Sequence, residues 1–259
     1  GGACAYGATH NVGAGESIQT AVNGASSGDT IVLTAPAEYV EDVAITGKAL
    51  RLVTPHRGVT TITGSLAISA TPANGKVTLR NLTLQGNLDA NGSSLELLRC
   101  EIHGTVTLPS KQGPAANDLQ LTVLQSNLRE KLISRTAKSW VGYSTMEQTY
   151  FEGKVEIVGN IFNGRANGGI GIDLNGTDTD ASIHNNQIYN FRLHANYPIT
   201  ETCIGIRIDG GAKADVRNNR ISDNRDSHSG TTETFCGMGV YVKSTAKTRI
   251  IANLMWSNH

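Results

Sequence analysis

Hydrophobic and polar residues alternate in a pattern that occurs three times towards the C-terminal end of the chain. Ile, Leu, Met or Val stands at every second position of residues 169–174, 203–208 and 237–242. Successive side chains of a strand point to opposite faces, so each run predicts a β-strand with one apolar face. The step is 34 residues, from Ile170 to Ile204 and from Ile204 to Met238. Such a fixed step indicates a solenoid of stacked coils.

A second apolar run in each copy carries asparagine at its centre. These runs cover 181–190, 214–223 and 248–257, and they place Asn186, Asn219 and Asn253 at equivalent points. Asn tolerates a left-handed backbone, so each copy is predicted to be strand, turn, strand with Asn at the corner. The column extends backward through Asn160, Ser126, Cys100 and Leu82. Because buried amides need partners, we expect an asparagine ladder from coil to coil.

Shorter elements are predicted ahead of the repeats. Apolar residues at helical spacing predict a helix over 17–25, which would cap the exposed end of the solenoid core. Alternating runs predict strands at 30–34, 43–45, 50–53, 61–63 and 66–68. Residues 109–118 read as a loop, and residues 129–154 as an aromatic-rich excursion from the coils. The chain stops at His259 directly after a predicted strand, so we expect its open edge to be covered by further coils or by self-association.

Two groups of residues resemble right-handed parallel β-helix proteins of the pectin-lyase-like superfamily. One is the opening, with Ser17-Ile-Gln-Thr-Ala-Val, Ser27-Gly-Asp-Thr-Ile-Val-Leu and Glu38-Tyr-Val-Glu, and the other is the repeated Ile/Val-x-Asn-Asn-x-Ile. The resemblance implies an all-β, right-handed parallel β-helix with a short N-terminal capping helix. It would occupy residues 17–259, after an N-terminal segment of residues 1–16.

The same resemblance leaves the function open. The superfamily implies lyases, hydrolases, epimerases and esterases of acidic or neutral polysaccharides, together with non-catalytic adhesins and phage tailspikes. Tyr39-Val-Glu41 is similar to an opening found in the esterases. The catalytic Gln-Asp and Asp-Phe segments of the esterases and the Asp-Pro-His of the epimerases have no counterpart in the sequence. A shared fold does not by itself give a function.

The composition limits the classes of molecule that the protein is expected to bind. Lys and Arg number 22 and so do Asp and Glu, and the absence of basic runs argues against nucleic acid or an anionic membrane as partner. No apolar run approaches the roughly 18 residues of a membrane span. Cys203 and Cys236 stand at matching places in neighbouring copies and could form a disulfide. That bond would suit a secreted, periplasmic or cell-surface protein.

Outward positions of the first strand in each copy form the candidate site. Coils stacked about 4.8 Å apart would align Gly205 and Gly239 in one row, Asp173, Arg207 and Tyr241 in the next, and Asp209 and Lys243 beyond them. The glycines would leave a floor for a sugar ring, and Tyr241 would offer a stacking face. The two cations could pair with the carboxylate of a uronate, arginine by its planar fork.

The lyases that this fold resembles use Arg or Lys as the base, often with calcium on the substrate carboxylate. The resemblance therefore implies Arg207 or Lys243 as base, with Asp173 and Asp209 as metal or acid partners. Hydrolysis would instead use Asp173 and Asp209 as paired carboxylates. Opposite charges on adjacent strands also stabilise an ordinary sheet surface, by roughly 0.2–1 kcal/mol a pair.

Other polar residues add weaker signals. His184 and Arg217 share an outward row beside the Asn corner and would bind substrate. Asp178 and Asp180 could bind calcium, although Asp and Gly are also common turn residues. His194 and His228 stand in loops of successive copies, but two histidines without a third ligand indicate little.

Two function classes therefore remain. One is a polysaccharide-active enzyme, lyase-like before hydrolase-like, which uses the outward residues of these strands. The other is a non-catalytic glycan-binding, adhesin or tailspike-like module, in which the solenoid is a stiff spacer. The missing catalytic motifs favour the second class, and the partner in both is a polysaccharide or glycan.

Overall fold

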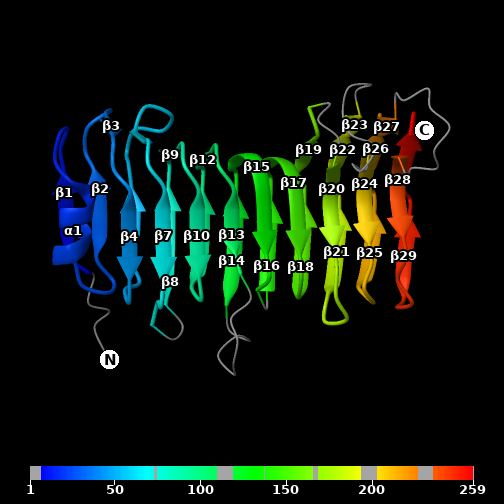
Figure 1. Cartoon of the computed structure of the whole chain (residues 1–259), viewed down its shortest axis with the longest axis horizontal. Coiled ribbons are helices and arrows are strands. Elements are labelled where there is room, and N and C mark those ends of the chain that lie inside the picture. The colour runs from blue at the N-terminus through cyan, green and yellow to red at the C-terminus, as the bar shows by residue number, and fades with distance from the viewer. Residues whose placement is uncertain are drawn as a thin grey trace. The chain divides into compact units, whose positions relative to one another are not determined.

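The computed structural model describes residues 7–72, 75–109, 119–136, 138–165, 169–193, 203–226 and 236–258. It contains two compact units, residues 1–130 (unit 1) and 131–259 (unit 2). Each unit stacks parallel strands into coils of a right-handed β-helix (Figure 1). The predicted fold class is confirmed.

In unit 1 the strands lie in three rows, and neighbours within a row run parallel. Row A contains β1 (Thr9–Val12), β2 (Thr30–Leu33), β5 (Arg51–Val53), β8 (Lys76–Arg80), β11 (Ser94–Leu98) and β14 (Gln120–Leu124). Row B contains β3 (Glu38–Tyr39), β6 (Thr61–Ile62), β9 (Thr83–Leu84) and β12 (Glu101–Ile102). Row C contains β4 (Val43–Thr46), β7 (Leu66–Ser69), β10 (Leu88–Asn91) and β13 (Val106–Leu108). β15 (Asn127–Ser134) spans the boundary at residue 130.

Unit 2 has the same three rows. Row A contains β16 (Lys138–Gly142), β18 (Lys154–Val158), β21 (Asp180–His184), β25 (Lys213–Arg217) and β29 (Thr248–Ile251). Row B contains the first part of β17 (Thr145–Phe151), then β19 (Ile161–Asn163), β22 (Gln187–Tyr189), β26 (Arg220–Ser222) and β30 (Leu254–Trp256). Row C contains the end of β17, then β20 (Gly169–Leu174), β24 (Cys203–Ile208) and β28 (Cys236–Val242). β23 (Arg192–Leu193) and β27 (Arg225–Asp226) form a separate parallel pair.

Each repeat therefore holds three main strands where the sequence predicted two. The second apolar run bends at its centre, because Asn185 has a left-handed backbone with φ of 60° and separates β21 from β22. The prediction of an excursion over 129–154 is also wrong, since β15, β16 and β17 occupy most of it. Its aromatic residues differ in burial: Phe151 at the end of β17 is fully buried, whereas Tyr143 in the turn between β16 and β17 is 62% exposed.

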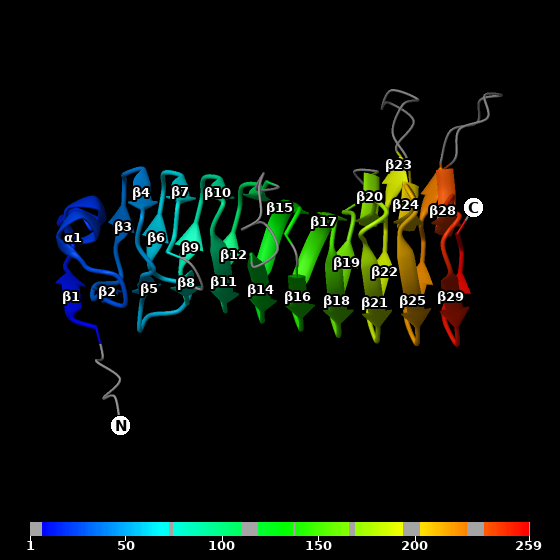
Figure 2. The same ribbon diagram turned by 90° about the horizontal axis from the view of Figure 1, so that it is seen from below.

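A short helix, α1 (Ile18–Gly24), confirms the predicted capping element and lies beside β1 and β2 in both views (Figures 1 and 2). The Ser17 side chain accepts the Thr20 N–H at its N-terminus. Glu41 accepts the N–H of Ile18 at 2.6 Å. This residue of the Tyr-x-Glu opening therefore stabilises the N-terminus of the helix. Tyr39 is buried and donates its hydroxyl to the Val12 carbonyl. No helix in the described ranges is long and apolar enough to cross a membrane.

Alternation places apolar side chains inside each coil. In β20 and β24, Ile172, Leu174, Ile206 and Ile208 are fully buried. The strands of the C-terminal coil differ, since Ile250, Leu254 and Trp256 are 42%, 59% and 45% exposed. The predicted loop at 109–118 lies almost wholly outside the described residues.

The asparagine residues at the corner between rows A and B are bonded to one another along unit 2. The Asn186 Oδ1 accepts both the backbone N–H of Asn160 at 2.9 Å and its side-chain amide at 3.0 Å. Asn219 repeats this arrangement toward Asn186, and Asn253 repeats it toward Asn219. We call these four residues the Asn column. The backbone groups at this buried corner cannot form hydrogen bonds with water. The side-chain amides of the Asn column form hydrogen bonds with them instead.

The Asn column predicts a large effect of Asn186→Ala on stability. The substitution removes the acceptor of the Asn160 N–H and the donor to the Ile157 carbonyl. Buried groups left without partners cost about 1–3 kcal/mol each, so we expect the free energy of unfolding to fall by roughly 2–4 kcal/mol. Urea unfolding followed by circular dichroism measures it. Asn185→Gly is the control, because glycine accepts a positive φ, and an equal loss in both variants would contradict the role of the column.

Candidate functional site

Four side chains of row C in unit 2 stand side by side on consecutive strands. The strand register pairs Tyr150 with Asp173, Asp173 with Arg207, and Arg207 with Tyr241. Two positions further along, just beyond the ends of these strands, lie Glu152, Asn175, Asp209 and Lys243. We call these eight residues the row C patch. The alignment of Asp173, Arg207 and Tyr241, predicted from the repeat, is present.

An ion pair holds the centre of the patch. Arg207 donates from Nε to Oδ1 of Asp173 at 2.8 Å and from Nη2 to Oδ2 at 2.5 Å. The Asp173 carboxylate is nearly buried, and the Arg207 side chain is 30% exposed. The hydrogen bonds that Arg207 donates to Asp173 are the main reason that the pKa of Arg207 is raised above its usual value. Arg207 is therefore a permanent cation, with N–H groups beyond the two that Asp173 accepts.

This geometry changes the roles open to the two residues. A guanidinium with a raised pKa is a poor base, but it is well suited to binding a carboxylate. Both oxygens of Asp173 accept from Arg207, which favours neither the acid nor the nucleophile role that hydrolysis requires. Asp209 accepts the N–H of Gly210 at 2.7 Å, and Lys243 is exposed at the end of β28.

Tyr150 and Glu152 belong to the patch, although the sequence analysis did not include them. The Tyr150 hydroxyl donates to Oε1 of Glu152 at 2.5 Å. Arg135 pairs with the same carboxylate at 3.2 Å and lies 5.2 Å from the centre of the Tyr150 ring. Burial, followed by the hydrogen bond to Glu152, raises the pKa of Tyr150 above 10.0. Alternation at the end of β17, where Thr149 and Phe151 are buried on either side of Tyr150, is the signal that could have placed Tyr150 here.

The glycines do not form the open floor that the sequence predicted. Gly205 and Gly239 are buried. A Cβ on Gly205 would lie 2.6 Å from the Gly239 carbonyl oxygen and 3.0 Å from the Asn224 amide. A Cβ on Gly239 would lie 3.1 Å from the amide of Asn258. These positions are glycine because the next corner of the coil packs against them, so they cannot contact a sugar ring.

Other predicted site residues lie away from the patch or are too exposed to define a site. His184 and Arg217 are register partners on β21 and β25 of row A, not on row C. Their side chains approach Glu156 at 3.7 Å and Asp215 at 3.3 Å. The predicted row of these two residues beside the Asn corner is therefore present, and their role in substrate binding stays a prediction.

Asp178 and Asp180 are exposed, and Asp180 lies across from Lys154 and Lys213 in the strand register. Over the described ranges, no three acidic, His or Cys side chains come together in a way that could hold a metal ion. Calcium therefore stays a prediction. His194 and His228 lie outside the described residues.

Cys203 and Cys236 are register partners on β24 and β28, as the repeat predicted. The side chain of Cys236 lies outside the described part, so their disulfide also stays a prediction.

The fold has counterparts among solved structures. The alginate lyase AlyGC of polysaccharide lyase family 6 aligns with a TM-score of 0.65 and 14% identity, over 96% of this chain and 40% of that chain. A single-residue variant of AlyGC aligns with a TM-score of 0.64 and 16% identity over the same shares. The chain thus spans two-fifths of AlyGC, and identities this low show the fold alone. The sequence matches no protein-family model and no curated protein.

The buried glycine row predicts that Gly205→Ala destabilises the protein. The new methyl group would collide with backbone of the next coil, and overpacking of this kind costs about 1–3 kcal/mol. Thermal or urea unfolding measures the loss. Gly24→Ala is the control, because nothing lies within 4 Å of its added Cβ. If Gly205→Ala left stability unchanged and weakened glycan binding instead, the open floor would be correct after all.

Proposed function

We propose that this chain is a polysaccharide lyase that cleaves a uronate polymer on the row C patch of unit 2. The observation that carries the proposal is the charged Arg207 guanidinium, fixed by Asp173 and placed between Asp173 and Tyr241 in the row. A planar fork of this kind recognises carboxylates, and tyrosine rings stack on sugar rings. The β-helix shared with AlyGC, named as an alginate lyase, supports an acidic substrate of this class.

The proposed reaction is a β-elimination. A base removes the proton on C5 of the uronate, the C5–H electron pair forms the C4–C5 double bond, and the bond from C4 to the linking oxygen breaks. That oxygen leaves with a proton from an acid. The cut therefore yields one chain with a new hydroxyl and one with an unsaturated sugar at its non-reducing end.

Four of the eight patch residues have a role in this scheme. Arg207 binds the substrate carboxylate and stabilises the negative charge that develops when C5 loses its proton. Lys243 is the base, since its side chain is exposed just beyond the end of β28. Tyr150 is the acid, because its raised pKa keeps the phenol protonated. Tyr241 stacks against a neighbouring sugar.

Calcium could supply further positive charge at the substrate carboxylate, but the patch has few carboxylate oxygens left to bind it. Asp173 already gives both oxygens to Arg207, and Glu152 is shared by Tyr150 and Arg135. Because its polymeric substrate lies outside cells, we propose that the protein is secreted, periplasmic or on the cell surface.

The first test measures ultraviolet absorbance of unsaturated products on a panel of uronate polymers, with and without calcium. We expect product from at least one polymer. Arg207→Ala should lower kcat/KM by at least about 100-fold, because it removes a charged partner of the transition state. Arg217→Ala on row A is the matched control and should keep full activity.

The outcomes separate the two function classes. Retained glycan binding without product from any polymer would make the chain a non-catalytic glycan-binding module. Equal losses of kcat/KM in Arg207→Ala and Arg217→Ala would instead show that the activity does not depend on row C.

A second test concerns Tyr150. If it is the acid, Tyr150→Phe should lower kcat by roughly 100-fold or more with little change in KM. Since its pKa is raised, the phenol keeps its proton further into the alkaline range than an ordinary tyrosine does, and the wild-type rate should fall only there. The phenylalanine variant should lack this high-pH limb. Tyr189→Phe on row B is the control, and an unchanged kcat in Tyr150→Phe would remove Tyr150 from the mechanism.

A further inference from the structure

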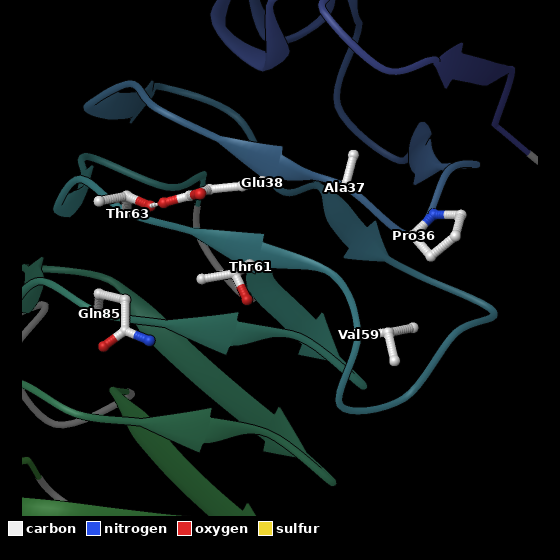
Figure 3. A pocket seen from close by; sticks show the side chains of 7 residues that line it. All are labelled: Pro36, Ala37, Glu38, Val59, Thr61, Thr63 and Gln85. Atoms are coloured by element: carbon white, nitrogen blue, oxygen red, sulfur yellow. Dashed lines mark hydrogen bonds between the residues drawn. The ribbon is translucent and has the colours of Figure 1, made fainter.

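A hollow lies on row B of unit 1. Figure 3 shows its lining: Pro36, Ala37, Glu38, Val59, Thr61, Thr63 and Gln85. The register pairs Glu38 with Thr61 on β3 and β6, while Tyr39 and Ile62 on the same strands are core residues. Glu38, Thr61 and Thr63 therefore point away from the core, and Gln85 joins them from the next coil.

Buried hydrogen bonds hold one wall of the hollow in place. The hydroxyls of Thr54 and Thr60 are 2.9 Å apart, and Thr60 donates to the Ala35 carbonyl at 3.2 Å. Both threonines are almost fully buried, so the segment between them is tied at each end. That segment carries Val59, which remains 55% exposed at the rim. The wall is therefore formed before any ligand binds, which reduces the entropy lost on binding.

The lining chemistry matches an uncharged sugar. Pro36, Ala37 and Val59 give an apolar side for the C–H face of a ring, and the hydroxyls and amide opposite can bond sugar hydroxyls. The Thr63 hydroxyl donates to Oε1 of Glu38 at 2.5 Å, which leaves Oε2 to accept from a ligand hydroxyl. Glu38 is the one charged residue of this lining, and its carboxylate would repel a uronate.

We propose that this hollow is a second carbohydrate site, which binds a neutral polysaccharide and is separate from the row C patch. Glu38 and the two threonines fix the ring by hydrogen bonds, and Val59 packs against its face. The two surfaces then differ in ligand class, because row C of unit 2 presents Arg207 and Lys243 to acidic chains. The inference stands whether or not the row C patch is catalytic.

The test is calorimetric titration of the whole chain with soluble neutral polysaccharides, namely a β-glucan, a mannan and a xylan. We expect one of them to bind with an affinity that is insensitive to salt. Glu38→Ala and Val59→Ser should each weaken it about tenfold, as loss of one charged hydrogen bond or one buried apolar contact predicts. Asp89→Ala and Val40→Ser are matched controls, exposed in the same unit but outside the lining.

Three results would overturn the proposal. The first is that no neutral polymer binds the wild-type protein. The second is that the lining variants keep affinities within about twofold of wild type, with all variants unfolding at the wild-type temperature. The third is that Arg207→Ala abolishes binding of the neutral polymer, which would show that this polymer binds at the row C patch. Loss of lyase activity in Arg207→Ala with neutral binding intact supports both sites independently.

Discussion

Parallel backbone hydrogen bonds join each coil to the next and hold equivalent residues about 4.8 Å apart. A side chain in an inner coil therefore has the side chains at the equivalent positions of the two adjacent coils as its neighbours, and together they form a column. Inside the coil this is favourable for apolar residues and for amides, which can donate to one neighbour and accept from the other. On the surface the same spacing brings charged side chains of adjacent coils together, so opposite charges attract and like charges repel. Asp173 and Arg207 occupy adjacent places in one column and bind through two hydrogen bonds.

The columns explain how the candidate site is built. A patch on row C needs no loop to assemble it, since the register alone places Tyr150, Asp173, Arg207 and Tyr241 in order. The rigid coils beneath keep these side chains at fixed spacing, which suits a linear polymer whose units repeat along the same direction. The hollow on row B depends on the same constraint, with buried threonines holding its wall.

Sequence periodicity predicted the features that recur from coil to coil, but few of the features that differ between coils. The fixed step of 34 residues, the apolar strands and the capping helix over residues 17–25 follow from spacing alone. The left-handed turn at the Asn corner was predicted, but the third strand of each coil was not, because strands of three residues such as β22 and β26 are too short to show an alternation of their own. The burial of Gly205 under Asn224 depends on contacts between residues far apart in the chain. Tyr150 was missed because β15 to β17 do not share the step of the later copies.

The glycine row has a consequence for how such a protein can change. Phe191 donates its N–H to Asn224, and Asn224 donates its N–H to Asn258, so one corner of successive coils is closed by side chains. Gly205 and Gly239 pack against that corner where the chain begins the next strand. A larger residue at either glycine would therefore disturb the packing of two coils at once, so these two positions can vary little over evolutionary time.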